Sequence, residues 1–253
     1  MKFENVETID FSKPLDFGTI FNQSLELFKK TWLQGVITNL LTLAIIFPFY
    51  LIIYLPFMAF GIIDPEAFRD NPDSNPLMLI PVGALFLIFS VVISVIALAL
   101  KSAFYRICRQ KDLGIEGADD YFYYFKKTYL IKLLKLSVVT MVISLLATML
   151  CFLPIIYVIV PLSFFNVIFA FNPEWTELEI TKASFKLGNA KWLITFGLMI
   201  ICGLLAQLVG MMMCLVGVFL TASFAYLPAY FIYKEMFGFD EFQEEEDLKI
   251  LEA

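Results

Sequence analysis

The sequence predicts an all-α membrane protein with six transmembrane helices, arranged as three hairpins that each follow a cytoplasmic amphipathic helix in the membrane interface. The chain of 253 residues is 60% hydrophobic and only 17% charged, with a mean hydropathy of +0.81. Soluble domains are about half apolar and a quarter charged. Two further observations predict the fold: apolar runs long enough to cross a bilayer, and a short motif that returns before each pair of runs.

Residues 1–15 are predicted to form a flexible leader, without the basic start and short apolar region of a signal peptide. Residues 16–31 follow as an amphipathic helix, with Asp16 as its N-cap. Its apolar face has nearly helical spacing and consists of Phe17, Ile20, Phe21, Leu27 and Phe28. An amphipathic helix beside a span is expected to lie in the membrane interface.

The first hairpin is expected within residues 16–100. Its two apolar runs, residues 35–63 and 77–100, are each about one bilayer thickness of helix. The polar, proline-rich and acidic residues 64–76 separate them.

Two longer apolar runs predict the second and third hairpins, within residues 118–171 and 176–235. Residues 130–171 would form a helix of about 60 Å, twice the hydrocarbon thickness of a bilayer. This run is therefore expected to fold back near residues 151–155. Residues 192–233 pose the same problem and are expected to turn within residues 210–217. A second short amphipathic helix, capped by Asp119 or Asp120, is predicted before the second hairpin.

The placement of Lys and Arg predicts the orientation. A cytoplasmic N-terminus puts 17 of the 18 basic residues on the cytoplasmic side and leaves only Arg69 outside. Residues 16–235 then form a single six-helix domain, followed by an acidic cytoplasmic tail at residues 236–253. The predicted location is the bacterial cytoplasmic (inner) membrane, with both termini in the cytoplasm.

A short motif recurs at the start of each predicted hairpin. Residues 28–33 (Phe-Lys-Lys-Thr-Trp-Leu) return as residues 125–130 (Phe-Lys-Lys-Thr-Tyr-Leu), and more weakly as residues 188–193 (Gly-Asn-Ala-Lys-Trp-Leu). Lysine and an aromatic suit a corner where an interfacial helix turns into the bilayer. The predicted interfacial anchors are Lys29, Lys30, Trp32, Lys126, Lys127, Tyr129, Lys191 and Trp192. Ancestral repetition and convergent anchoring both explain the likeness.

Residues 180–192 (Ile-Thr-Lys-Ala-Ser-Phe-Lys-Leu-Gly-Asn-Ala-Lys-Trp) resemble the signature that precedes a span in the membrane domain of glycerophosphoryl diester phosphodiesterases. Residues 16–32 resemble the same motif. The resemblance covers most of residues 16–235 and implies a six-helix membrane domain. That family's hydrolysis uses histidine and acidic metal ligands, whereas this chain has no histidine and only an acidic tail after residue 235. The resemblance therefore does not imply hydrolysis.

No catalytic residue, cofactor site or metal site is predicted. Histidine, the commonest general base and metal ligand, is absent. The four cysteines form no C-x-x-C pair and are expected to be packing residues. Polar residues within spans are expected mainly to bond neighbouring helices. A more specific alternative to this packing role is a polar cavity lined by Asn39, Asn166 and Gln207.

Three functions are compatible with this pattern. The first is a non-catalytic membrane protein that interacts with lipid or serves as a membrane-embedded scaffold for a protein partner, at the cytoplasmic face or the acidic tail. The second is the permease subunit of an ATP-driven transporter, coupled through the charged residues 101–129. The third, an intramembrane lipid-modifying enzyme, lacks a plausible base. Membrane lipids are the expected partners, and no nucleic-acid footprint is present.

Overall fold

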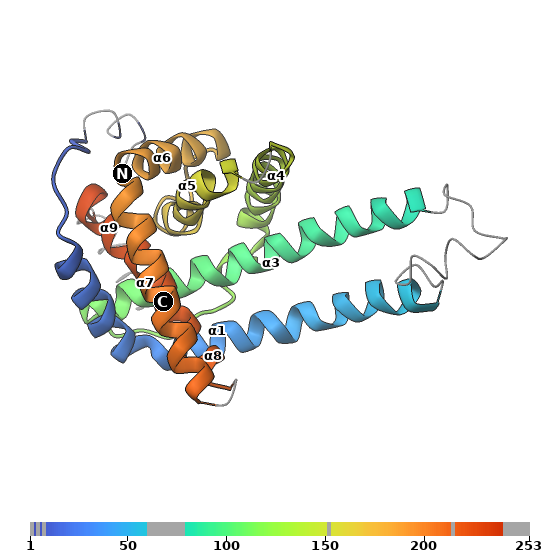
Figure 1. The fold of residues 1–253 in the computed structure, drawn as a ribbon, viewed down its shortest axis with the longest axis horizontal. Coiled ribbons are helices and arrows are strands. Elements are labelled where there is room, and N and C mark those ends of the chain that lie inside the picture. Colours follow the sequence, from blue (N-terminus) through green and yellow to red (C-terminus); the bar gives the residue numbers. More distant parts are fainter. Residues whose placement is uncertain are drawn as a thin grey trace.

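The computed structural model describes residues 3, 6, 9–59, 79–150, 153–213 and 216–239, and every regular element among them is helical (Figure 1). The predicted outer loop at residues 64–76 and residues 240–253 of the predicted acidic tail lie outside the described residues.

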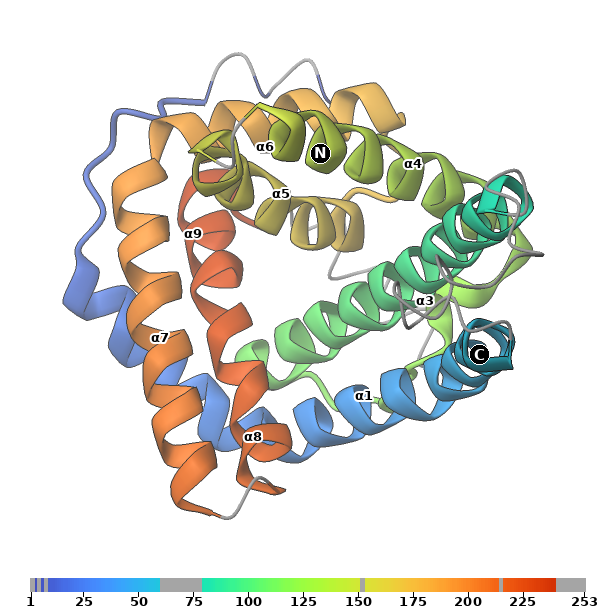
Figure 2. The same cartoon turned by 45° about the vertical axis from the view of Figure 1, so that its right-hand side comes forward.

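Helices α1 (Phe17–Ala59) and α3 (Leu79–Leu113) form an antiparallel arm that projects from the rest of the molecule (Figure 1). The predicted N-cap is confirmed, because the Thr19 N–H donates to Asp16 Oδ2 at 2.6 Å. The predicted corner at residues 28–33 is not a break between two helices, since α1 continues through it, although α1 bends along its length (Figure 1 and Figure 2). The Thr31 hydroxyl bonds the Leu27 carbonyl one turn back, at 2.9 Å, within an intact helix.

The second hairpin consists of α4 (Lys127–Met149) and α5 (Leu153–Phe171). The long apolar run is thus divided into two helices, and residues 151 and 152, at the predicted turn, lie outside the described residues. The predicted amphipathic helix before α4 is wrong: only the 3-10 turn η3 (Tyr123–Phe125) forms. It ends because Lys126 is extended, with φ −63° and ψ 141°.

The third hairpin follows α6 (Glu177–Ala190), the one predicted interfacial helix that forms as a separate element. Helix α7 (Trp192–Met212) runs out to a turn within the predicted residues 210–217. The chain returns in three pieces: α8 (Val216–Thr221), η4 (Ala222–Tyr226) and α9 (Leu227–Phe237). Proline in the first turn of α9 suits a new helix start, because proline lacks a backbone N–H.

Gly210 lets the two sides of this hairpin approach closely. A Cβ on Gly210 would lie 2.7 Å from the Val218 Cα, too close for any side chain. Gly217 lies in the same close contact, since a Cβ there would lie 2.7 Å from the Gly210 carbonyl oxygen. Glycines at this point therefore let the two sides of the hairpin pack closely.

Five helices among the described residues are long and apolar enough to cross a membrane: α1, α3, α4, α5 and α7. This supports a multi-pass membrane protein, although α8 and α9 are each too short to add a sixth unbroken span. The hairpins do not run parallel to one another. In Figure 2, α4, α5 and α6 lie side by side while α7 and α9 cross them, and the α1–α3 arm leaves in a third direction.

The buried core lies where the three hairpins meet, a region we call the base. It draws on the second helix of each hairpin, and α5 is the most enclosed of the candidate spans. Every described Lys and Arg belongs to the base, whereas the hairpin tips expose apolar side chains. The base comprises residues 13–33, 98–135, 160–191 and 224–239.

The leader residues that the structure describes pack on the base. Val6 is buried, and the Phe3 ring lies 5.4 Å from Trp175 at the start of α6. Further along, Phe11 contacts Phe237, with 5.9 Å between their ring centroids. The prediction of a flexible leader did not include these contacts.

Candidate interface at the base

The anchors of the first motif copy face outward. Lys29 and Lys30 are exposed on α1, and Trp32 is 45% exposed one turn further along the helix. Thr31, between them, is fully buried. This segment of α1 therefore buries one face against the protein and presents two ammonium groups and an indole on the other.

The anchors of the second copy lie beside a cluster of tyrosines, Tyr123, Tyr124 and Tyr129. Lys126 and Lys127 are exposed at the start of α4, with the Lys126 Nζ 4.6 Å from the Tyr123 ring centroid. The Arg106 guanidinium lies over the same ring at 3.8 Å. Tyr129 is half-buried, and its hydroxyl lies 3.3 Å from that of Tyr123. Arg106 of α3 and Lys126, just before α4, thus both contact the Tyr123 ring, and these contacts join the start of α4 to α3.

The anchors of the third copy differ from the prediction. Lys191 is only 7% exposed, and its Nζ donates to the Lys13 carbonyl of the leader. Burial lowers the pKa of Lys191, and nearby Asp10 partly offsets this. Trp192 donates from Nε1 to the Tyr157 carbonyl at 3.1 Å, and stacks on Phe196. This lysine and this tryptophan hold the protein together and do not face outward.

Helix α6 packs along α5 rather than standing apart as a surface helix. The residue of α6 at this close approach is a glycine, and a Cβ on Gly188 would lie 2.8 Å from the Pro161 Cα. At its far end, the Tyr157 hydroxyl of α5 donates to Asn189 Oδ1 at 2.5 Å. The buried residues of α6 are Ile180, Ala183, Ser184, Leu187 and Gly188. The residues that carry the family resemblance are thus largely those that pack against α5.

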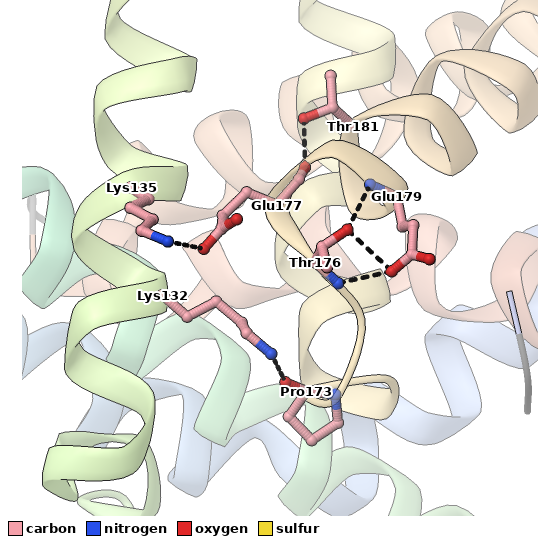
Figure 3. Close-up of polar contacts among 7 residues, drawn as sticks. All are labelled: Lys132, Lys135, Pro173, Thr176, Glu177, Glu179 and Thr181. Carbon is pink, nitrogen blue, oxygen red and sulfur yellow. Dashed lines mark hydrogen bonds and ion pairs between the residues drawn. The ribbon is translucent and has the colours of Figure 1, made fainter.

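The start of α6 is fixed by a capping box and by two lysines of α4 (Figure 3). The Glu179 N–H donates to the Thr176 hydroxyl at 3.3 Å, while the Thr176 N–H donates to Glu179 Oε2 at 2.7 Å. Lys135 pairs with Glu177 at 3.2 Å, and Lys132 donates to the Pro173 carbonyl. Burial alone would raise the pKa of Glu177, but its backbone N–H and Lys135 hold that pKa below its usual value.

The three residues of the predicted polar cavity have separate surroundings. Asn39 on α1 donates to the Phe219 carbonyl of α8 at 3.2 Å. Asn166 is buried on α5, where its carbonyl accepts from Ser102 of α3 at 3.2 Å. Gln207 is exposed on α7. No hydrogen bond among the described residues joins these three side chains.

The carboxylates of Asp112 and Asp119 at the base each contact a residue far away in the sequence. Asp112 accepts from Lys234 at 2.5 Å and from the Tyr230 hydroxyl at 2.8 Å, which fixes α9 to the end of α3. Asp119 pairs with Lys111 at 3.2 Å and accepts from Gln34 at 3.0 Å. Sequence analysis missed both, because nothing local indicates that residues 112 and 234 meet.

A third contact holds Lys101 against an aromatic ring. Its Nζ lies 3.8 Å from the centroid of Tyr226, at the end of η4. Lys101 is half-buried. The two residues are 125 positions apart, so sequence analysis could not pair them.

Among the described residues, no three His, Cys, Asp or Glu side chains are placed to hold a metal ion. Cys108 and Cys202 are buried free thiols, while Cys151 and Cys214 lie outside the described residues. What the base offers chemically is therefore positive charge beside aromatic rings. That combination suits phosphate or carboxylate groups at a membrane surface.

No protein-family model matches the sequence, and neither curated proteins nor solved structures show a similar chain. The resemblance to the phosphodiesterase membrane domain therefore stays a prediction.

Proposed function

We propose that this chain is a non-catalytic, multi-pass protein of the bacterial cytoplasmic membrane whose base binds anionic lipid headgroups. The proposal rests on the uneven distribution of charged and apolar side chains over the surface of the molecule. Exposed lysines of two motif copies lie at the base, whereas apolar side chains are exposed towards the hairpin tips. Lysines just outside a span attract anionic lipid, at about 1 kcal/mol each. In these two motif copies the exposed lysines are Lys29, Lys30, Lys126 and Lys127.

The proposal includes six crossings, with residues 216–237 as a sixth crossing in three helical pieces, and both termini in the cytoplasm. It also includes an ancestral threefold repeat. Residues 160 positions apart share their burial in α1 and α6, which supports repetition beyond the anchoring lysines. The matched pairs, all at most 2% exposed, are Ile20 with Ile180, Ser24 with Ser184, and Leu27 with Leu187.

Lipid preference can be measured by native mass spectrometry of the full chain released from nanodiscs of phosphatidylglycerol and phosphatidylcholine. We expect wild-type protein to retain phosphatidylglycerol preferentially. Changing Lys29, Lys30, Lys126 and Lys127 together to glutamine should remove most of that preference, because the four charges carry the attraction. The matched control changes the same four residues to arginine, which keeps the charge. Wild-type protein without any preference would refute the proposal.

The orientation is tested separately, by labelling single cysteines in a cysteine-free chain. Lys30→Cys should react only with reagent on the cytoplasmic side, and Ser74→Cys only from outside. Lys30 is a suitable site because it is exposed, unlike the native Cys108. The reverse pattern would overturn the proposed topology.

The structure offers less support to the transporter alternative. Coupling to an ATPase would use the charged residues 101–129, but several of these charges are paired within the chain. Lys111 pairs with Asp119, and Asp112 with Lys234. The same mass-spectrometry experiment would detect a retained protein partner. A retained ATPase subunit would favour the transporter function, and another retained protein would favour the scaffold function.

A further inference from the structure

Lys101 differs from the other half-buried or buried lysines of the base. Lys111, Lys132, Lys191 and Lys234 each direct Nζ to an oxygen, either a carboxylate or a backbone carbonyl. Within the described part of the chain, the Lys101 amine has a ring for a neighbour and no oxygen acceptor. A partly desolvated ammonium has three donors to satisfy, and a π-face satisfies them only in part.

The backbone around Lys101 is held on both sides. The next residue, Ser102, is fully buried and donates to the Asn166 carbonyl of α5 at 3.2 Å. One turn on, the Tyr105 hydroxyl donates to the Tyr226 carbonyl at 3.1 Å. Because α3 is tied to α5 and to η4 here, the amine and the Tyr226 ring stay together. The site is preorganised for a ligand that enters from the exposed side of Lys101.

The sequence of α3 sets the depth of this amine in the membrane. No charged residue occurs between Leu79, where α3 begins, and Lys101. These 22 uncharged residues, 79–100, make about 33 Å of helix, one hydrocarbon thickness. Lys101 is therefore the first charge beyond the hydrocarbon layer, at the level of the lipid phosphates. Phosphate oxygens are the abundant acceptors at that depth.

We propose that Lys101 and Tyr226 form a specific site for the phosphate group of one anionic phospholipid, where the Lys101 side chain of α3 meets the Tyr226 ring of η4. The amine supplies the charge and the directed hydrogen bonds, and the phenol hydroxyl of the same ring offers a second donor. This inference rests on the proposed function, but it singles out one lipid from the diffuse attraction of the exposed lysines. Lys126 also lies over a tyrosine ring, but it is exposed and belongs to the diffuse attraction.

The test counts the phosphatidylglycerol molecules that survive stepwise delipidation of the purified full chain, and titrates the last one back. We expect wild-type protein to keep one lipid most tightly. Lys101→Met keeps the length of the side chain and removes its charge, so the apparent Kd of that lipid should rise about tenfold. Lys182→Gln, at an exposed lysine of α6 outside the motif copies, should change it less than about twofold, because a single exposed charge contributes little to one bound lipid. Lys101→Arg should retain the lipid.

Two further arms identify the ligand and the role of the ring. Inorganic phosphate, added at millimolar concentration in place of lipid, should fail to displace the tight phosphatidylglycerol. Displacement would show a free-phosphate site and overturn the lipid assignment. Tyr226→Leu should weaken retention as Lys101→Met does, whereas Tyr226→Phe should weaken it less. Should Lys101→Met fail to elute as folded protein, Lys101→Arg and Tyr226→Leu decide the question.

The possible failures are distinguishable. If Lys101→Met keeps the tight lipid while the fourfold lysine variant loses its phosphatidylglycerol preference, this site is refuted and the proposed function stands. If wild-type protein has no preference at all, both are refuted.

Discussion

Two segments with the same sequence pattern form different local structures in this protein. Residues 20–35 lie in α1 and residues 180–195 in α6 and α7, and positions 160 apart are buried alike on one face. In α1 the helix continues through the motif, whereas α6 ends at Ala190 and a new helix begins at Trp192. A shared buried face is therefore compatible with either a continuous helix or a break.

The difference follows from the four residues before the aromatic. Phe-Lys-Lys-Thr in α1 contains no helix breaker, and the Thr31 hydroxyl bonds back within the helix. Gly-Asn-Ala-Lys at the end of α6 begins with two poorer helix formers. Tertiary contacts hold the chain at the break, because Gly188 packs on Pro161 and Asn189 accepts from Tyr157. Lys191 there takes φ −118° and ψ 25°, outside the helical range.

The largest expected effect tests the shared buried face. Leu27→Ala and Leu187→Ala remove side chains that are 2% and 0% exposed, so each should lower the free energy of unfolding by about 3 kcal/mol through lost contacts and a cavity. Unfolding in mixed SDS and dodecylmaltoside micelles measures this. Leu193→Ala, at a leucine that is 81% exposed, is the control and should change stability little. Very unequal losses of stability at the two buried leucines would show that the buried faces of the two segments are not equivalent.

The second effect separates the segments. Gly188→Ala introduces a Cβ that would lie 2.8 Å from the Pro161 Cα, so α6 must shift from α5. We expect a loss of about 2 kcal/mol, typical of overpacking. The matched control is Gly203→Ala, where a Cβ would meet nothing within 4 Å and a helix gains propensity. An unchanged Gly188→Ala protein would mean that the close approach does not position α6.

Sequence analysis predicted the two hairpin turns because they follow from run length, a property of the local sequence. It also found the helix start at Asp16, where a capping side chain acts within three residues. It failed where distant residues decide. The packing of α6 along α5 and the burial of Lys191 both depend on contacts with distant parts of the chain. The Lys101–Tyr226 pair depends on the same kind of contact.

The third effect concerns how α6 starts. Thr176 and Glu179 cap each other's backbone, so Thr176→Ala removes one half of a reciprocal pair and should cost about 1 kcal/mol. The same micelle unfolding experiment measures it. Thr181→Ala serves as the control, because that hydroxyl only bonds back to the Glu177 carbonyl within the helix. A loss no larger than the control's would show that the lysines of α4, rather than the box, fix this helix start.

The smallest effect concerns how α1 starts, where a single carboxylate caps the helix. The Thr19 N–H, which donates to Asp16, holds the pKa of that carboxyl below its usual 3.8. Because the folded pKa is the lower one, the stabilisation is complete above the unfolded pKa. It is lost as the pH falls through the folded pKa. Asp16→Asn keeps a capping oxygen that does not titrate. Its unfolding free energy should therefore fall less than that of the wild type between pH 6 and pH 3.

Thr181→Ala, whose hydroxyl bonds back to the Glu177 carbonyl within α6, is the control and should leave the slope with pH unchanged. Identical slopes for wild type and Asp16→Asn would show that the carboxylate charge adds nothing to the cap of α1. The hydrogen-bonding oxygen would then be the common requirement of both segments.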